Sequence, residues 1–260
     1  MNKIKAIRAI RTKMRQGKCT IGSWMQIPDG SVAEIMGNAG YDWVAVDMEH
    51  GSITVAQLPD LFRALELGGT LPLVRLARGN AKECKQVLDA GAGGVIVPMV
   101  ETAAQLTAVR DACRWPPAGT RGVGFCRANL FGKNFETYRE QAQAPLLVAM
   151  IEHTRAVDNL EEILSVEGLD AILIGPYDLS ASIGLTGKFV HTNFKKTMER
   201  IRNLCRKNKV PSGIHVITPD VRDINNRIQE GYQFVVYSTD AMFLWSTSSS
   251  PKIKRIKRKF

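Results

Sequence analysis

Two apolar stretches, each ending in a carboxylate, occupy the middle of the chain: Leu146-Leu147-Val148-Ala149-Met150-Ile151-Glu152 and Ala171-Ile172-Leu173-Ile174-Gly175-Pro176-Tyr177-Asp178. An amphipathic segment of roughly ten residues between two such runs is typical of parallel strands that are buried on both faces. Because parallel strands end at the same edge of a sheet, we expect Glu152 and Asp178 to emerge together. Mg²⁺ usually takes one or two carboxylates and leaves positions for water and substrate oxygens, so the pattern predicts a divalent metal site.

The same strand pattern recurs on both sides of these stretches, with helical segments between the strands. The further expected strands are residues 19–25, 43–47, 71–75, 94–98, 212–216 and 234–238. Eight strands alternating with helices in 260 residues predict an α/β protein with a single-domain (β/α)8 TIM barrel. We assign residues 1–245 to the barrel, including an N-terminal helix, and residues 246–260 to a Ser-rich and basic C-terminal tail.

One long segment, residues 115–145, interrupts the alternation. It is rich in Gly, Pro and aromatic residues and contains one expected helix at 135–143. Excursions of this length in a compact domain tend to be lids or contact surfaces.

The positive charge of the chain is concentrated at its two ends. The formal net charge is +10, but residues 1–18 and 252–259 hold 13 of the 35 basic residues and no acidic one. The remainder has 22 basic against 25 acidic residues, so we expect no nucleic-acid partner for the body. The tail is expected to be a solvated extension, with a contact to an acidic partner, a membrane or RNA as the alternative.

Cysteine usage and hydropathy bear on the compartment. The five cysteines are odd in number and form no CxxC pair, which favours a reducing cytoplasm over a disulfide framework or a cysteine-based zinc site. No run of 18 uninterrupted apolar residues occurs, so no transmembrane span is expected. The basic start of the chain lacks the apolar core of a secretory signal. We expect a first helix packed on the domain, with a transit peptide as the alternative.

The expected strands end in polar residues, and in a barrel these would share one face. That face would hold Asp47, Glu49, His50, Arg75, Glu152, His153, Tyr177, Asp178, His215 and Asp240. For His215 and Asp240 a structural and a chemical role are both open. None of the 16 lysines falls on an expected strand, which disfavours a Schiff-base mechanism.

Several of these segments together carry a family resemblance. The chain resembles the HpcH/HpaI aldolase family, class II metal-dependent pyruvate aldolases, over about residues 19–240. The matching elements are Asp47-Met48-Glu49-His50-Gly51, Pro72-Leu73-Val74-Arg75, Leu88-Asp89-Ala90-Gly91-Ala92, Val97-Pro98-Met99-Val100, Gly119-Thr120-Arg121-Gly122-Val123-Gly124, Ile151-Glu152 and Gly175-Pro176-Tyr177-Asp178-Leu179-Ser180-Ala181-Ser182.

The resemblance implies a metal site and a catalytic base. Glu152 and Asp178 would hold a divalent cation, Mg²⁺, Mn²⁺ or Co²⁺, which a 2-oxo acid would chelate. Arg75 would face the ketone oxygen, and His50, oriented by Asp47, would be the general base. The chemistry is sound independently of the family, because removal of a proton next to a carbonyl is slow unless a cation meets the enolate charge.

The resemblance also implies how substrate is bound and which reaction follows. Main-chain N–H groups around Gly175, Pro176 and Tyr177 would bind the substrate carboxylate, and Arg121 would reach substrate or a neighbouring subunit. The implied enzyme is a carbon–carbon lyase that reversibly cleaves a 4-hydroxy-2-oxo acid, such as a 2-keto-3-deoxy sugar acid, to pyruvate and an aldehyde. It would be a cytoplasmic homo-oligomer, a hexamer by resemblance.

The sequence departs from the family pattern in three places, and the first is Arg78-Gly79-Asn80, where Trp-Asn-Asp is common. Tyr177 stands where Ala is usual, and Met150 stands where Gln is common, which narrows the space beside the metal and removes a polar neighbour. Two other functions therefore stay open: a lyase or decarboxylase that uses the same metal-stabilised enolate, and a non-catalytic barrel used as a binding protein.

Overall fold

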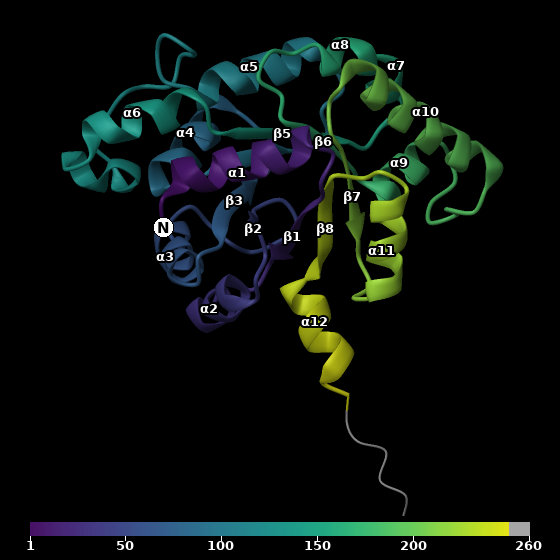
Figure 1. Ribbon diagram of the computed structural model, residues 1–260, viewed down its shortest axis with the longest axis horizontal. Coiled ribbons are helices and arrows are strands. Elements are labelled where there is room, and N and C mark those ends of the chain that lie inside the picture. Colours follow the sequence, from purple (N-terminus) through teal and green to yellow (C-terminus); the bar gives the residue numbers. More distant parts are fainter. Residues whose placement is uncertain (250–260) are drawn as a thin grey trace, which may run out of the picture.

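The fold is a closed barrel of eight parallel strands in sequence order, which confirms the predicted (β/α)8 architecture (Figure 1). The computed structural model describes residues 1–249. The strands are β1 (Thr20–Met25), β2 (Trp43–Asp47), β3 (Leu71–Arg75), β4 (Gly94–Val97), β5 (Leu146–Ile151), β6 (Ala171–Ile174), β7 (Ser212–Val216) and β8 (Phe234–Thr239).

Helices cover the outside of the barrel. They are α1 (Lys3–Arg15), α2 (Gly30–Asn38), α3 (Leu58–Leu67), α4 (Ala81–Ala90), α5 (Ala103–Cys113), the 3₁₀ helix η1 (Arg127–Gly132), α6 (Phe135–Gln143), α7 (Thr154–Asp158), α8 (Leu160–Leu164), α9 (Pro176–Ser182), α10 (Thr192–Asn208), α11 (Val221–Gln229) and α12 (Asp240–Thr247). Among the described residues, no helix is both long and apolar enough to cross a membrane.

The strands present alternate residues to the two sides of the barrel wall. Residues such as Ile174 and Ile214 pack outward against the helices. Their neighbours on the other side, including Leu73, Val148 and Leu173, fill the barrel interior. The residue that follows an outward-facing strand end therefore points to the inside, at the mouth formed by the strand carboxyl ends.

The first helix closes the opposite end of the barrel. Ile7, Ile10 and Met14 of α1 are buried and belong to the same apolar cluster as the interior residues. Their helical spacing places all three on the face that packs against the strands. Because this end is filled with side chains, the mouth at the strand carboxyl ends is the face on which a site can open.

Four parts of the secondary structure differ from the sequence expectation. The 3₁₀ helix η1 lies in the segment 115–145, where only the helix at 135–143 was expected. The single helix expected between β5 and β6 is two short helices, α7 and α8. Helix α9 follows directly on β6, and helix α12 follows directly on β8 and projects away from the body (Figure 1). Helix α12 takes in Ser246 and Thr247, the start of the expected tail, and residues 250–260 lie outside the described part.

Candidate active site

Asp47 is hydrogen-bonded to several residues of the barrel mouth, the face formed by the carboxyl ends of the strands. It ends β2, is fully buried and accepts two hydrogen bonds from Arg75, from Nε at 2.8 Å and from Nη2 at 2.5 Å. Gln26 Nε2 donates a third at 2.9 Å. Hydrogen bonds from Arg75 and Gln26 hold the pKa of Asp47 below its usual range, although burial opposes this. Asp47 is therefore a permanent anion that fixes the guanidinium of Arg75.

Arg75 is held on three sides. Besides the forked contact with Asp47, its Nη1 lies 3.1 Å from Glu49 Oε2, and its guanidinium carbon lies 4.5 Å from the centre of the Trp24 ring. An Arg fork that binds a carboxylate and stacks on an indole has little rotational freedom. The structure thus presents a fixed positive charge in the mouth, where the sequence placed it.

His50 lies in the mouth but is not oriented by Asp47 in the way that we expected. Asp47 Oδ1 accepts from the backbone N–H groups of Glu49 at 3.0 Å and His50 at 3.2 Å, so it holds the loop and not the ring. The carboxylate near the imidazole is Glu49, with Oε2 at 3.9 Å from His50 Nε2. The side chain of His50 is 59% exposed, which leaves it free to meet a substrate.

Glu152 follows β5 and is buried in the mouth. Its Oε2 accepts a hydrogen bond of 2.8 Å from the backbone N–H of Met99, a residue with φ of 49°. That left-handed backbone is costly for a non-glycine residue and turns the N–H toward the carboxylate. A Cβ at Gly175 would lie 2.5 Å from Glu152 Oε1, so only glycine lets the carboxylate take this position.

The acidic groups in the mouth repel one another. Burial, the largest cause, and the charges of Glu49 and Asp178 together raise the pKa of Glu152 to about 7, against the Met99 hydrogen bond and the charge of Arg75. Burial also raises the pKa of Glu49. The negative charges of Asp47 and Asp178 raise this pKa as well, and the positive charge of Arg75 opposes the shift. The structure thus brings Asp178, at the start of α9, within electrostatic range of Glu152, as the sequence predicted.

These carboxylates fit a divalent cation. Within residues 1–249, neither Glu152 nor Asp178 forms an ion pair with Lys or Arg, whereas Asp47 and Glu49 share Arg75. Two carboxylates without a cation are costly to hold together in a partly buried site. A cation on Glu152 and Asp178 would remove that cost. The described chain has no group of three or more metal-binding side chains, so Mg²⁺ here would keep several positions for water and substrate oxygens.

Tyr177 lies at the rim of the mouth, next to Asp178, one of the two carboxylates expected to bind the metal. It is the second residue of α9, after Pro176, and its ring is half exposed and packs edge-on against Phe189 with centroids 5.0 Å apart. The first N–H groups of a helix have no partner within it, so the backbone of Tyr177 and Asp178 offers donors at the rim. Met150 lies lower in the barrel, in the apolar interior.

Arg121 is not brought to the mouth. It is buried in the excursion between α5 and β5, where its Nη2 donates to Tyr138 Oη at 2.9 Å and its guanidinium stacks on Trp115. The expectation that Arg121 contacts substrate therefore fails within this chain. Tyr138 and Ala142 of helix α6 pack against Trp115 and enclose the guanidinium, whose Nε and Nη1 have no hydrogen-bond partner among the described residues.

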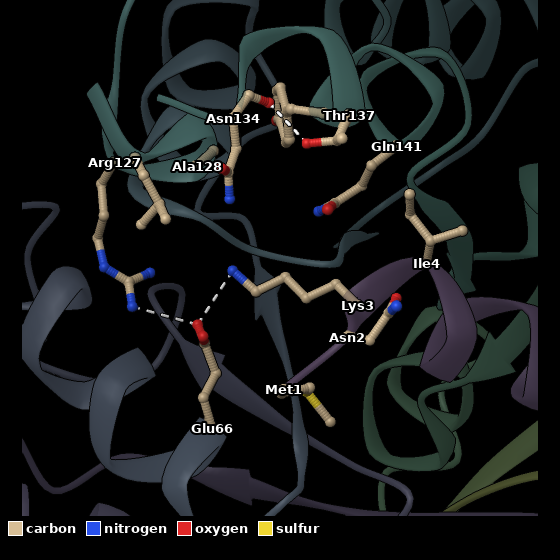
Figure 2. A pocket seen from close by; sticks show the side chains of 12 residues that line it. Met1, Asn2, Lys3, Ile4, Glu66, Arg127, Ala128, Asn134, Thr137 and Gln141 are labelled. Carbon is tan, nitrogen blue, oxygen red and sulfur yellow. Dashed lines mark hydrogen bonds and ion pairs between the residues drawn. The ribbon is translucent and has the colours of Figure 1, made fainter. Parts of the chain in front are cut away.

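A pocket separate from the barrel mouth lies at the start of α1, where α3, η1 and α6 meet (Figure 2). Its volume is about 350 Å³. Its charged groups pair with one another, since Glu66 Oε1 lies 3.0 Å from Lys3 Nζ and 3.2 Å from Arg127 Nη2. Lys3 and Arg127 also donate to the carbonyls of Gly91 and Ala90 at the end of α4. The pocket is thus a structural junction of four elements.

Three contributors to the mouth were given no role from the sequence. Glu49 was given no chemical role, yet it contacts Arg75 and faces Asp178; its place two residues after a strand-end acid was the available signal. Trp24, the stacking partner of Arg75, is indistinguishable in sequence from any core residue of a strand. The Met99 N–H depends on a backbone angle that no local motif announces.

Comparisons with known proteins identify the family of the chain. The family model for HpcH/HpaI aldolase/citrate lyase matches residues 20–246. The chain belongs to this family. It is an aldolase, a carbon–carbon lyase.

Relatives cover nearly the whole chain. A hydroxypyruvate/pyruvate aldolase of Roseobacter denitrificans is 35% identical, covering 94% of this chain and 95% of its own. A 4-hydroxy-2-oxovalerate aldolase of Novosphingobium aromaticivorans is also 35% identical, covering 96% and 94%. The crystal structure of a family protein from Burkholderia cenocepacia superposes with a TM-score of 0.86 at 29% identity, covering 92% and 96%.

Proposed function

We propose that this aldolase reversibly cleaves a 4-hydroxy-2-oxo acid to pyruvate and an aldehyde, with a divalent cation held by Glu152 and Asp178. The observation that carries the proposal is the pair of carboxylates without a cation beside the Arg75–Asp47 ion pair in one barrel mouth. The names of the relatives, which include hydroxypyruvate/pyruvate and 4-hydroxy-2-oxovalerate aldolases, support the substrate class.

Arg75 and His50 have separate roles in the proposed reaction. When bound, the cation would polarise the ketone and offset the enolate charge. Arg75, fixed by Asp47 and Glu49, places a second positive charge beside the ketone oxygen, where negative charge develops. In the cleavage direction His50 takes the proton of the 4-hydroxyl group, the bond between carbons 3 and 4 breaks, and the aldehyde leaves. A proton then returns to carbon 3 to give pyruvate.

The mouth also suits the rest of the substrate. Backbone N–H groups at the start of α9, beside Gly175, Pro176 and Tyr177, would receive the carboxylate of the 2-oxo acid. The ring of Tyr177, half exposed at the rim, would border the space left for the aldehyde. Its bulk in place of a small residue would restrict acceptors on that side.

We also propose that the protein forms a homo-oligomer. Helix α12 projects from the body (Figure 1), and its Leu244 and Trp245 are 60% and 73% exposed. Large apolar side chains gathered on a projecting helix favour burial against another copy.

Chelation tests the metal directly. Treatment with EDTA is expected to abolish cleavage of 4-hydroxy-2-oxo acids, because the enolate would lose one of its two positive charges, and Mg²⁺, Mn²⁺ or Co²⁺ should restore it. Pyruvate release and calorimetric titration with Mn²⁺ are the measurements. Full activity after exhaustive chelation would exclude the metal. Release of CO₂ from oxaloacetate without aldol cleavage would instead favour a decarboxylase that uses the same enolate.

His50 is tested by proton exchange. In the His50→Ala variant, exchange of the pyruvate methyl protons with solvent should fall by about 10²- to 10⁴-fold, the usual size of general acid–base catalysis. Mn²⁺ affinity should stay nearly unchanged, since no carboxylate is lost. The matched control is His191→Ala, at the exposed N-cap residue of α10, which has no role in the proposed reaction. Exchange at the wild-type rate in the His50 variant would assign the base to another residue.

A further inference from the structure

A basic pocket lies at the closed end of the barrel, beside helix α1. Its volume is about 430 Å³. Among its lining residues, Asp170 precedes β6, Pro211 precedes β7 and Gln233 precedes β8, so the pocket lies at the amino ends of these strands. It shares no residue with the barrel mouth, which the carboxyl ends of the strands form. The proposed active site therefore does not account for it.

The pocket carries an excess of positive charge. Its charged lining residues are one carboxylate and four basic side chains: Asp170, Arg11, Arg15, Arg206 and Lys209. Asp170 is already paired with Arg11, whose Nε and Nη2 donate to its two oxygens at 2.7 and 2.9 Å. Within residues 1–249, none of Arg15, Arg206 and Lys209 forms an ion pair. The pocket thus has three positive charges that the described chain does not neutralise.

Basic residues elsewhere on the same helices do have acidic partners. Lys13 of α1 pairs with Asp42, and Lys207 of α10 lies 2.7 Å from Glu161. The segment 250–260 contains no Asp or Glu that could serve the pocket. A counter-charge for the pocket must therefore come from outside the chain.

Helix dipoles explain only part of this charge. Three helices end at the pocket, since Arg15 is the last residue of α1, Lys209 is the C-cap of α10, and Gly231 follows α11. The carboxyl end of a helix carries about −0.5 of an elementary charge, so three ends supply roughly −1.5. About half of the positive excess remains.

Lys209 occupies a position that normally favours glycine. Its φ of 55° is left-handed, as at many helix C-caps, where glycine is usual because a side chain is strained there. A lysine at this position adds a cation to the pocket at the cost of that strain. Strain of this kind that persists in a fold is a sign of use.

The size and the donors of the pocket define the ligand that it suits. Ligand sites for small molecules have volumes of about 300–1,000 Å³, so the pocket is large enough for more than one ion. Guanidinium groups bind phosphoryl oxygens through paired N–H donors, and a lysine adds a point charge. None of the described residues that line the pocket is aromatic, so no ring is present on which a nucleobase could stack.

We propose that this pocket binds a polyphosphate group, a chain of linked phosphoryl groups whose negative charges match its three unpaired cations. The group can belong to an inorganic polyphosphate or to a nucleoside triphosphate. The inference goes beyond the proposed aldolase function and does not depend on it, because the pocket and the mouth lie at opposite ends of the barrel.

The probe for this test is inorganic tripolyphosphate, titrated into the full-length protein by calorimetry. EDTA is present so that no divalent cation can link the probe to the carboxylates of the mouth, and about 0.15 M salt screens long-range attraction. One tripolyphosphate should bind per chain. The variant Arg206→Gln/Lys209→Gln should raise the Kd about 10- to 100-fold, the usual effect of losing hydrogen bonds to charged groups.

Two further variants separate a pocket from general attraction and from misfolding. Lys254→Gln/Lys257→Gln removes the same charge from the basic segment at the end of the chain and should change the Kd by less than about two-fold, since one site dominates. Lys209→Gly removes the cation and the strain together. It should weaken binding about 10-fold while the urea midpoint of unfolding stays equal or rises.

The outcomes distinguish the possible ligands. Equal affinity for tripolyphosphate, ATP and GTP would support recognition of the phosphoryl chain alone, whereas a nucleotide bound more than about ten-fold more tightly would identify a nucleoside triphosphate as the ligand. Absence of saturable binding, or an equal loss of affinity in the Lys254/Lys257 variant, would overturn the proposal. Neither result bears on aldol cleavage, which is measured separately.

Discussion

Replacing Glu152 with Gln is expected to abolish aldol cleavage and, in the same variant, to stabilise the metal-free protein at pH 8. Activity disappears because the amide cannot replace a carboxylate ligand of a hard cation. Binding of Mn²⁺, measured by calorimetry, should be lost with it. The gain in stability has a separate origin, in the raised pKa of the buried carboxylate.

The sign of the stability effect follows from the pKa. Burial and the neighbouring charges of Glu49 and Asp178 raise the pKa of Glu152 from 4.5 to about 7. The folded chain therefore holds this proton more tightly than the unfolded chain. The stabilising contribution is complete below pH 4.5 and is lost as the pH rises through 7. A difference of this size corresponds to about 3 kcal/mol at pH 8.

Urea unfolding in EDTA measures this effect. The free energy of unfolding of Glu152→Gln should exceed that of the wild type by about 3 kcal/mol at pH 8, and the difference should shrink toward zero near pH 5. The control is Glu162→Gln, an exposed carboxylate on α8, for which we expect no such divergence. A wild-type protein at least as stable as Glu152→Gln at pH 8 in EDTA would mean that the carboxylate is already compensated.

The second large effect is expected at Arg75. Replacement by Lys should lower kcat/KM by about 10²- to 10³-fold, the usual cost of removing one donor aimed at a developing oxyanion. A lysine keeps the charge but cannot bind Asp47 through two nitrogens, reach Glu49 and stack on Trp24 together. The loss should fall on kcat and on pyruvate proton exchange alike, because both pass through the enolate.

A stability measurement separates chemistry from folding in this experiment. Arg75→Leu would leave Asp47 buried without a cation, which typically costs about 3–5 kcal/mol. Arg75→Lys should lose much less stability than Arg75→Leu while losing most of the activity. If activity followed stability across the two variants, Arg75 would be a structural residue of the barrel mouth and not a group that meets the enolate.

The fold was predictable because the barrel strands are buried on both faces. Strands β2, β3 and β7 begin and end at the predicted residues, since each is a short apolar run bounded by polar or turn residues. Helix α9 was missed because it has seven residues and starts at Pro176, too short to show a helical period. Helix α12 was missed because its sequence continues directly from β8 without a turn signal.

The site was predictable to the extent that topology alone places residues. Parallel strands bring Asp47, Arg75 and Glu152 to one mouth whatever their side chains do. The contacts within the mouth were not predictable, because they depend on loop geometry: Asp47 binds the backbone of His50 and not its ring. Arg121 was misplaced for a similar reason, since its partner Tyr138 comes from a segment whose fold no local pattern reveals.

The apolar seal that α1 forms with Ile7, Ile10 and Met14 gives the barrel a floor. A substrate then reaches Glu152 from the side of the strand carboxyl ends, past the exposed side chains of His50 and Tyr177. If the 2-oxo acid binds deep in the mouth, near Glu152, the aldehyde would bind between it and solvent. The end of the aldehyde remote from the reacting carbonyl would then point toward solvent. Acceptors of different length could then share the same chemistry, because a longer chain extends outward and not against the floor.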